Sequence, residues 1–398
     1  MNEKLHGKCV LAPFYGTQLF GRERENIECF KALMAMGYDV KVVCSSREIK
    51  GGSAGAIIES LGLKVGEIEF GSHFSISYFK SIKGYWHRQI KRIWNCSRFM
   101  RQKEKECHPD FIFIGGTMEF LYLWPWLLFT KVPLIFRVED GPIWNSKFHL
   151  NAYRQLLMQS NLILCCSKFI QKECEKLLPI SRHERLFHLP NCAPKFEPDS
   201  AANQETVRKK SEVSNENLQL LYVGQITANK GIVELIEAMR SFAGNPVELI
   251  IVGGSKSTSK FASELQMQTE VEKLNVRWIG KVNDPTPFYD SADVHIAPSV
   301  YEEPFGLVVV EAKRSRVPSI IFPSGGMQEL VNHEVDGWIC EDKSAGALVK
   351  SIELAMLRRD ELETMGERAY VDFEHNYSFE RFVLNFKAIL NNAVIEKE

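Results

Sequence analysis

The chain has 398 residues, of which 45% are hydrophobic and 25% are charged. These values are ordinary for a globular protein of two domains, and they exclude a disordered chain, a collagen-like chain and a disulfide scaffold. The formal net charge is −1, yet residues 1–199 hold 28 Lys and Arg against 20 Asp and Glu, while residues 200–398 hold 21 against 30. A basic half and an acidic half indicate different partners for the two halves.

The ten cysteines are scattered and form no Cys-x-x-Cys pair. This spacing disfavours structural zinc and indicates free thiols in a reducing cytosol. The first residues, MNEKLHGKCVLAPFYG, lack the apolar core of a signal peptide. The longest apolar stretch, residues 120–129, is too short to cross a bilayer. We therefore expect a cytoplasmic protein.

Short apolar runs alternate with helix-like segments along the whole chain. In the first half the predicted strands are residues 9–13, 40–44, 111–114, 133–138 and 162–167, with a predicted helix at 25–36. In the second half the predicted strands are residues 218–224, 247–253, 276–279, 294–298 and 317–322, and the predicted helices are residues 231–242, 261–274, 306–315 and 345–357. Near-continuous β-branched strands that alternate with helices are typical of buried parallel sheets. Two such series predict an α/β protein with two doubly wound domains.

A polar segment without clear periodicity, residues 193–217, is predicted to be a linker between the domains. It separates an N-terminal domain of residues 1–192 from a C-terminal domain of residues 218–376. Residues 377–398 include a further predicted helix with one apolar face.

A glycine-bearing segment, residues 222–231, follows a predicted strand and begins a predicted helix. Gly224 and Gly231 let the backbone approach an anion, and Lys230 adds an ammonium group that can contact a phosphate. The same segment also fits an ordinary strand–turn–helix corner with a solvated lysine.

Two glutamates, Glu303 and Glu311, have seven residues between them. Pro304 and Gly306 bracket a helix start, which places Glu303 on a loop and Glu311 on the helix. Both carboxylates can accept hydrogen bonds from sugar or ribose hydroxyls, and the first amides of the helix can bind a phosphate. Two glutamates at this spacing are common by chance, but the surrounding Pro-Phe-Gly and the later residues 322–329 make chance a poor explanation.

Taken together, these features resemble the retaining glycosyltransferases of family 4, which have the GT-B fold of two Rossmann-like domains facing each other across a cleft. The likeness covers about residues 218–342, and its motifs are Gly224…Lys230-Gly231, Glu303-x7-Glu311, Gly325-Gly326…Glu329 and Asp336-Gly337. The resemblance implies that the C-terminal domain holds a UDP- or GDP-sugar, and that neither a metal nor another cofactor is required. It also implies that the final helix, within residues 377–398, packs back on the N-terminal domain.

The resemblance further implies a role for individual residues of the second half. Lys230 would contact the diphosphate, Glu303 the hydroxyls of the transferred sugar and Glu311 the ribose. The remaining residues expected at the nucleotide sugar are Gly224, Ile279, Val282, Gly306, Leu307 and Val308. Gln225 stands where the family commonly has an arginine, so a positive charge is missing at this point.

In the first half, Gly16 follows the first predicted strand, where the family has a glycine-bearing loop near the sugar donor; an ordinary turn fits this position as well. Many members carry a histidine close to the transferred sugar, and here Glu139 or Asp140 occupies that place. A carboxylate there can act as a base or stabilise an oxocarbenium-like transition state. The run Asp140-Gly141-Pro142 also fits a turn and helix cap.

Residues 76–106 combine apolar residues at helical spacing with nine Lys and Arg residues, and carry Trp86 and Trp94 near the apolar border. A basic amphipathic helix of this kind suits an anionic membrane surface. A core-packing helix with a solvated basic face is the alternative. Nucleic acid is disfavoured because no recognition fold accompanies the charge.

The sequence and this resemblance together predict a glycosyltransferase at the inner face of the plasma membrane, and the resemblance implies that it is retaining and metal-independent. It would move a hexose-type sugar to a hydroxyl of a lipid-linked or cell-surface glycan, in polysaccharide or lipopolysaccharide biosynthesis. The alternative is a non-catalytic glycosyltransferase-like subunit that binds a nucleotide sugar or a membrane and positions a partner enzyme. A GT-B epimerase or phosphorylase is disfavoured, because the context of Glu303 and Glu311 favours transferases.

Overall fold

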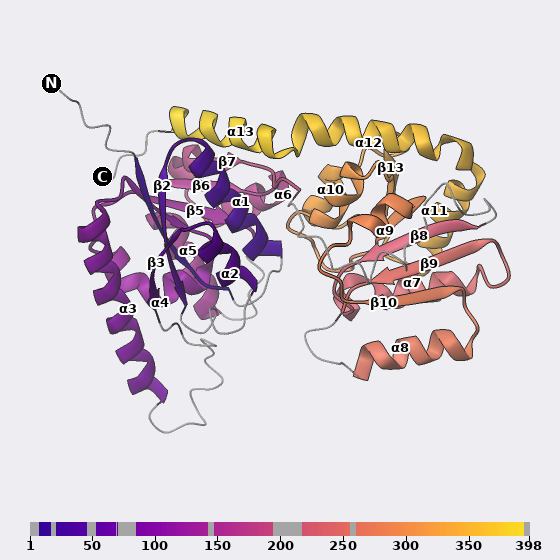
Figure 1. Cartoon of the computed structure of the whole chain (residues 1–398), viewed down its shortest axis with the longest axis horizontal. Helices are drawn as coiled ribbons and strands as arrows, with labels where there is room; N and C mark the ends of the chain where they lie inside the picture. The colour runs from indigo at the N-terminus through magenta and orange to yellow at the C-terminus, as the bar shows by residue number, and fades with distance from the viewer. Residues whose placement is uncertain are drawn as a thin grey trace. The chain divides into compact units, whose positions relative to one another are not determined.

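The computed structural model describes residues 8–16, 21–45, 53–68, 70, 85–141, 147–193, 217–254 and 260–393. The chain divides into two compact units, Met1–Pro190 with Phe382–Glu398, and Asn191–Arg381 (Figure 1). These divisions fall at 190/191 and 381/382, whereas the sequence-based boundaries are 192, 217 and 377. Most of the predicted linker, residues 194–216, lies outside the described residues.

The first unit is built on a seven-stranded parallel sheet. Its strands are β1 (Cys9–Phe14), β2 (Asp39–Ser45), β3 (Lys64–Ile68), β4 (Phe111–Ile114), β5 (Leu134–Val138), β6 (Leu162–Cys165) and β7 (Leu186–His188). Its helical segments are α1 (Gly21–Ala35), α2 (Ser53–Ser60), α3 (Tyr85–Cys107), α4 (Thr117–Leu127), α5 (Lys147–Gln159), α6 (Lys168–Glu175) and the 3-10 helix η2 (Ile180–Arg185). The strand order is β3-β2-β1-β4-β5-β6-β7.

The second unit contains a six-stranded parallel sheet of order β10-β9-β8-β11-β12-β13. Its strands are β8 (Leu218–Val223), β9 (Val247–Val252), β10 (Val276–Gly280), β11 (Val294–Ala297), β12 (Ser319–Ile321) and β13 (Gly337–Ile339). Its helical segments are η4 (Ala228–Lys230), α7 (Ile232–Arg240), α8 (Lys260–Val271), α9 (Thr286–Ser291), α10 (Leu307–Arg314), η5 (Gly325–Leu330), α11 (Ala345–Leu357), η6 (Arg359–Glu361) and α12 (Leu362–Asn376). The last helix among the described residues, α13, covers Phe379–Asn392.

The central strands of the first sheet have apolar sequences that suit burial on both faces. The sequences of β4, β5 and β6 are FIFI, LIFRV and LILC, and every residue in these strands is buried. Continuous burial is expected where helices cover both faces of a parallel sheet. The edge strand β3, with the sequence KVGEI, is mostly part-exposed. The α/β fold of two Rossmann-like doubly wound domains, predicted from the sequence, is confirmed.

Both sheets contain a point where the strand order reverses along the chain. In the first sheet β1 lies between β2 and β4, and in the second β8 lies between β9 and β11. Connections on either side of such a point leave in opposite directions, which opens a crevice at the carboxyl ends of the strands. Ligands of open α/β sheets bind in these crevices, so each unit has one edge at which a site is expected.

Candidate active site

Two loops meet at the carboxyl edge of the second sheet, one after β8 and the other after β11. Gly231 ends the first loop with a φ of +70°, and a Cβ at this residue would lie 1.7 Å from the carbonyl oxygen of Pro298. Both the positive φ and the lack of room for a Cβ atom therefore require glycine at position 231. The carbonyl oxygen of Asn229 accepts a hydrogen bond from the amide of Val300 at 3.0 Å. These contacts hold Lys230 against the loop that follows β11.

Lys230 and Glu303 meet directly across these two loops. The Nζ atom of Lys230 lies 2.5 Å from Oε1 of Glu303, although 73 positions separate the residues in sequence. The hydroxyl of Ser299 donates to the same carboxylate oxygen at 2.7 Å. The Lys230 side chain is 34% exposed and that of Glu303 13% exposed. A partly exposed pair of this kind adds little to stability, but it presents an ammonium and a carboxylate to solvent at the edge where a ligand is expected.

A second carboxylate, Glu302, fixes the backbone beside Glu303. Its Oε1 accepts from Nζ of Lys343 at 2.5 Å, and its Oε2 accepts from the amide of Gly325 at 2.6 Å. The amide of Gly326 donates to the carbonyl oxygen of Glu303 at 2.7 Å. The glycines of the motif at 325–326 therefore hold the loop that carries Glu303. No motif or spacing in the sequence indicates Lys343, which lies 41 positions from Glu302.

The start of α10 follows the same loop. Gly306 precedes the helix with a φ of +115°, and Leu307 and Val308 form its first turn. The first amides of a helix have no partner within the helix, and the helix dipole makes this end favourable for an anion. The structure thus places the three predicted phosphate-binding amides at a helix start on the same loop as Glu303.

The residues predicted for the nucleoside lie around Tyr289. The hydroxyl of Tyr289 lies 2.9 Å from Oε2 of Glu311 and 3.2 Å from the carbonyl oxygen of Val308. Ile279 and Val282 pack against the apolar cluster that contains Tyr289. Glu311 itself is only 4% exposed. One aromatic side chain therefore links the predicted ribose carboxylate to the two apolar residues predicted beside the base.

The loop after β8 begins with Gly224 and Gln225. The amide of Gly224 donates to the carbonyl oxygen of Val252 at 3.0 Å. The hydroxyl of Tyr222 donates to the carbonyl oxygen of Gln225 at 2.7 Å, and burial raises the pKa of Tyr222 well above its usual range. Main-chain contacts therefore fix this loop without the arginine that the family commonly has at position 225.

Glu139 and Asp140 follow β5 in the first unit and have different surroundings. Glu139 is 8% exposed, and its Oε1 accepts a hydrogen bond from Nε of the fully buried Arg137. Arg137 also donates to the carbonyl oxygen of Leu189 at 2.7 Å and lies over the ring of Phe382. The side chain of Asp140 is 58% exposed. Glu139 therefore belongs to a buried ion pair, and Asp140 is the more accessible of the two carboxylates.

Arg22 is a functional candidate that the sequence did not indicate. Its guanidinium donates to the carbonyl oxygen of Tyr15, next to Gly16, at 3.3 Å and to Oε1 of Glu23 at 2.8 Å. Its Nη1 lies 3.6 Å from Oδ2 of Asp140. Arg22 thus joins the loops after β1 and β5 at the carboxyl edge of the first sheet.

Glu119 completes this cluster from the start of α4. It is 1% exposed, and its Oε1 accepts a hydrogen bond from the amide of Tyr15 at 3.0 Å. A Cβ at Gly116 would lie 2.6 Å from Oε2 of Glu119 and 3.3 Å from Nη1 of Arg22, so glycine makes room for both groups. Burial raises the pKa of Glu119 to about 7, although the charge of Arg22 acts in the opposite direction.

The raised pKa predicts a specific pH dependence of stability. The carboxyl of Glu119 titrates near pH 7 when folded and near 4.5 when unfolded, so between these values the folded chain binds more protons. Stability therefore falls as the pH rises through this window. The isosteric variant Glu119→Gln does not titrate, and relative to wild type we expect it to gain up to about 3 kcal/mol between pH 5 and pH 8. Urea unfolding at a series of pH values measures this gain.

The exposed Glu59 supplies the control, because Glu59→Gln changes the same chemical group without burial. A difference between Glu119→Gln and wild type that stays constant from pH 5 to pH 8 would show that Glu119 does not titrate in this window.

Comparison with known proteins shows which family the second half of the chain is similar to. Residues 203–372 match the family model of glycosyl transferases group 1. An uncharacterized glycosyltransferase of Methanocaldococcus jannaschii is 36% identical over 135 residues, which are 33% of this chain and 34% of that protein. The capsular polysaccharide biosynthesis glycosyltransferase CapM of Staphylococcus aureus is 29% identical over 206 residues, or 51% of this chain and 53% of CapM. The matches thus span a third to a half of the length of these relatives.

The fold has close counterparts among solved structures. The crystal structure of HepE from Anabaena in complex with UDP and glucose superposes with a TM-score of 0.75 at 18% identity, covering 97% of this chain and 100% of HepE. This likeness concerns the whole chain, whereas the family match concerns the half that carries Lys230, Glu303 and Glu311. Residues 203–372 are therefore similar to the glycosyl transferases group 1, and the two Rossmann-like units have the fold found in GT-B glycosyltransferases.

Proposed function

We propose that the protein is a retaining glycosyltransferase that moves a hexose-type sugar from a UDP- or GDP-sugar to a hydroxyl of a polysaccharide, lipopolysaccharide or lipid-linked acceptor. The observation that carries this proposal is the contact of Lys230 with Glu303 beside the start of α10. The group 1 match supports it, as do the capsular polysaccharide role in the name of CapM and the UDP and glucose in the HepE crystal.

The second unit supplies the groups that a nucleotide sugar needs. Lys230 and the amides of Gly306, Leu307 and Val308 stabilise the negative charge of the departing diphosphate, which is where charge develops in the transition state. Glu303 accepts hydrogen bonds from sugar hydroxyls and orients the reacting carbon. These cationic and amide groups do the work that a metal does in other transferases, so we propose that no metal is required.

The reaction exchanges one bond at the anomeric carbon. The bond from this carbon to the phosphate oxygen breaks, and a bond to the acceptor oxygen forms on the same face of the sugar. The acceptor proton passes to the leaving phosphate oxygen, and a nucleoside diphosphate departs. Asp140, the accessible carboxylate after β5, stabilises the positive charge that builds on the sugar ring.

The test is sugar transfer in the absence of metal. UDP- and GDP-sugars are supplied with oligosaccharide acceptors, nucleoside diphosphate release is measured, and the anomeric configuration of the product is read by NMR. We expect transfer with retention from one of the nucleotides. An inverted product would contradict the mechanism.

A second candidate function is that of a non-catalytic subunit that binds a nucleotide sugar and positions a partner enzyme. Two observations favour it, namely the uncharged Gln225 and the engagement of Glu139 by Arg137. The two functions differ in one measurable respect, because this subunit would bind a nucleotide without releasing a nucleoside diphosphate from any sugar conjugate.

We further propose that α3 docks the protein on the cytoplasmic face of the plasma membrane. Gln89, Cys96 and Met100 are buried, so one face of α3 packs on the unit. The opposite face leaves Ile90 60% and Trp94 67% exposed. The exposed basic residues on this helix are Arg88, Lys91, Arg98, Arg101 and Lys105. Apolar side chains among cations fit an anionic bilayer surface.

Part of the predicted membrane segment does not bear on this proposal. Residues 76–84 and the side chain of Trp86 lie outside the described residues. Met100, one of the apolar residues within the predicted segment 76–106, is buried in the core and is not available to a membrane. Among the helices that the structure describes, none has the length and apolar character needed to traverse a bilayer.

Removing three charges from α3 tests the docking proposal. The variant Lys91→Ser, Arg98→Ser, Arg101→Ser is expected to bind phosphatidylglycerol vesicles about 100-fold more weakly, since each juxtamembrane cation contributes about 1 kcal/mol. The control variant removes three exposed charges from the second unit, at Arg240, Lys260 and Lys350. Equal loss in both variants, or no loss in the first, would exclude α3 as the docking surface.

A further inference from the structure

A small pocket lies at the amino edge of the first sheet, the edge opposite to Asp140. Its volume is about 210 Å³, and it lies among the end of α4, the end of α5 and the 3-10 helix η2. Leu134, the first residue of β5, and Asn161, which precedes β6, line its floor. The catalytic proposal uses none of these residues.

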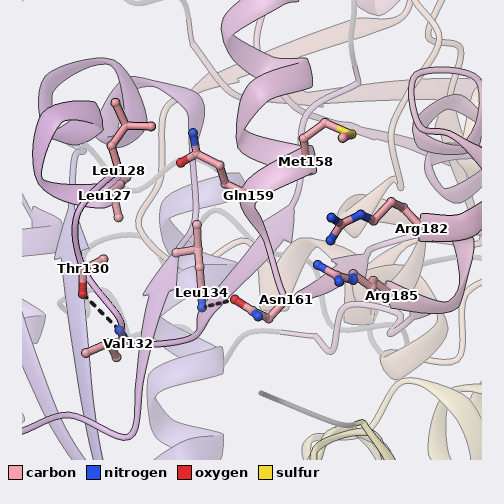
Figure 2. A pocket seen from close by; sticks show the side chains of 10 residues that line it. All are labelled: Leu127, Leu128, Thr130, Val132, Leu134, Met158, Gln159, Asn161, Arg182 and Arg185. Atoms are coloured by element: carbon pink, nitrogen blue, oxygen red, sulfur yellow. Dashed lines mark hydrogen bonds between the residues drawn. The ribbon is translucent and has the colours of Figure 1, made fainter. Parts of the chain in front are cut away.

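The polar groups of the pocket are dominated by two guanidinium groups. Figure 2 shows the side chains of Arg182 and Arg185 directed into the pocket from η2. None of the ten described residues that line the pocket is acidic. Arg185 donates to the carbonyl oxygen of Ser160 at 3.4 Å, which holds its side chain over the pocket. A guanidinium group presents several N–H donors, and its planar arrangement suits the oxygens of a phosphate.

The backbone opposite the arginines is fixed by internal hydrogen bonds. The side-chain oxygen of Asn161 accepts from the amide of Leu134 at 2.9 Å, and the hydroxyl of Thr130 accepts from the amide of Val132 at 3.1 Å. Both bonds are visible in Figure 2. The pocket is therefore preformed in this part, which lowers the ordering cost of binding.

We use the word rim for the exposed apolar residues Leu128, Phe129 and Ile180, which line the pocket or lie one or two positions in sequence from residues that line it. Leu128, which lines the pocket, is 51% exposed, and the next residue, Phe129, is 73% exposed. Ile180, the first residue of η2, is 85% exposed. The guanidinium of Arg101 lies 5.4 Å from the ring centroid of Phe129, so this rim is continuous with the basic face of α3. A soluble anion gains nothing from contact with apolar side chains, whereas the acyl chains of a lipid can pack against them.

We propose that this Arg182–Arg185 pocket binds the phosphate of an anionic phospholipid headgroup while Leu128, Phe129 and Ile180 enter the acyl boundary. The proposal extends the membrane docking argued for α3 and does not depend on sugar transfer. Charge complementarity selects a phosphate, and the apolar rim selects a lipid as its source. The headgroup site would fix the orientation of the first unit on the bilayer, which a diffuse basic helix does not.

The test uses a soluble lipid, so that the charge of a bilayer surface plays no part. Dihexanoylphosphatidylglycerol, kept below its micelle concentration, is titrated calorimetrically into wild type and into Arg182→Gln, Arg185→Gln. We expect the double variant to bind at least about tenfold more weakly, because it loses charged hydrogen bonds to the phosphate. The control, Arg154→Gln, Lys172→Gln, removes two exposed charges from the same unit and keeps wild-type affinity. Equal affinity of the double variant and wild type overturns the proposal.

Two further measurements are needed. One distinguishes a lipid from a soluble phosphate as the ligand, and the other tests whether misfolding explains the loss of binding. Glycerol 3-phosphate is titrated in parallel, and binding as tight as that of the lipid would assign the pocket to a soluble anion and overturn the lipid proposal. Ile180→Ser leaves both arginines in place, and we expect it to weaken lipid binding while circular dichroism and melting temperature stay unchanged. Unaltered lipid binding in this variant would likewise reject the role of the rim.

Discussion

Replacing Lys230 or Glu303 with alanine is expected to lower the rate of sugar transfer by about 100- to 1000-fold, the range found when one group that stabilises developing charge is removed. Lys230→Ala removes the ammonium that faces the departing diphosphate, so its effect falls mainly on kcat. Glu303→Ala removes the hydrogen-bond acceptor for the sugar hydroxyls. Because the two side chains contact each other in the structure, each variant also releases its partner. The double variant is therefore expected to lose less than the product of the two single losses.

The chain offers a matched control in the pair Lys350 and Glu341. These residues form an exposed ion pair of 2.8 Å in the same unit. Lys350→Ala and Glu341→Ala make the same chemical changes and are expected to keep wild-type transfer rates. Wild-type rates in both Lys230→Ala and Glu303→Ala would show that the active site does not lie at this edge of the second sheet.

Replacing Lys313 with methionine is expected to lower the free energy of unfolding by about 3–5 kcal/mol, the cost of leaving one partner of a buried ion pair alone. The Nζ atom of Lys313 lies 2.7 Å from Oδ2 of Asp336 and 2.8 Å from Oδ2 of Asp372. The side chains of Lys313 and Asp336 are 2% and 1% exposed. Methionine fills most of the volume but leaves the carboxylate of Asp336 without its cation.

Urea unfolding monitored by circular dichroism measures this loss. Where the two units unfold in separate transitions, the transition of the unit that contains Lys313 is the one expected to shift. Lys260→Met is the control, since Lys260 is 91% exposed and its partner Glu264 lies on the same helix. We expect it to change stability by less than about 0.5 kcal/mol. A loss below about 1 kcal/mol in Lys313→Met would show that the buried pair does not hold α10 in place.

This interaction also explains the motif Asp336-Gly337. Asp336 accepts hydrogen bonds from the amide and the side chain of Asn332 at 2.9 and 2.8 Å, in addition to the contact with Lys313. It therefore anchors α10, whose first amides are the proposed phosphate site. The motif supports the site through the position of a helix.

The sequence predicted the central strands and the loops between them because buried parallel strands have a characteristic apolar composition. A parallel sheet also ensures that the loops after β8 and β11 emerge at the same edge, and the structure brings Lys230 and Glu303 together there. The short strands β3, β7 and β13 were not predicted, since KVGEI, LFH and GWI lack a long apolar run. Pairing with a neighbouring strand makes them strands, and pairing is not a local property.

The supporting residues were less accessible to prediction. Arg137 and Glu139 lie two positions apart on an extended segment, so their side chains share one face, and this period could have revealed the ion pair. Lys343 and Glu119 act on loops far away in sequence, and no spacing connects them to Glu302 or Tyr15. The Arg182–Arg185 pocket depends on how the ends of α4 and α5 meet η2, which only the packed structure defines.

The most direct test of the account is a calorimetric titration of UDP and of GDP, in metal-free buffer with a chelator, into wild type and Lys230→Ala. The account predicts that wild type binds one of the two nucleotides and that Lys230→Ala binds it at least about tenfold more weakly, as expected for the loss of a charged contact to the diphosphate. Binding of neither nucleotide by wild type, or equal binding by the variant, would contradict a donor site built on Lys230.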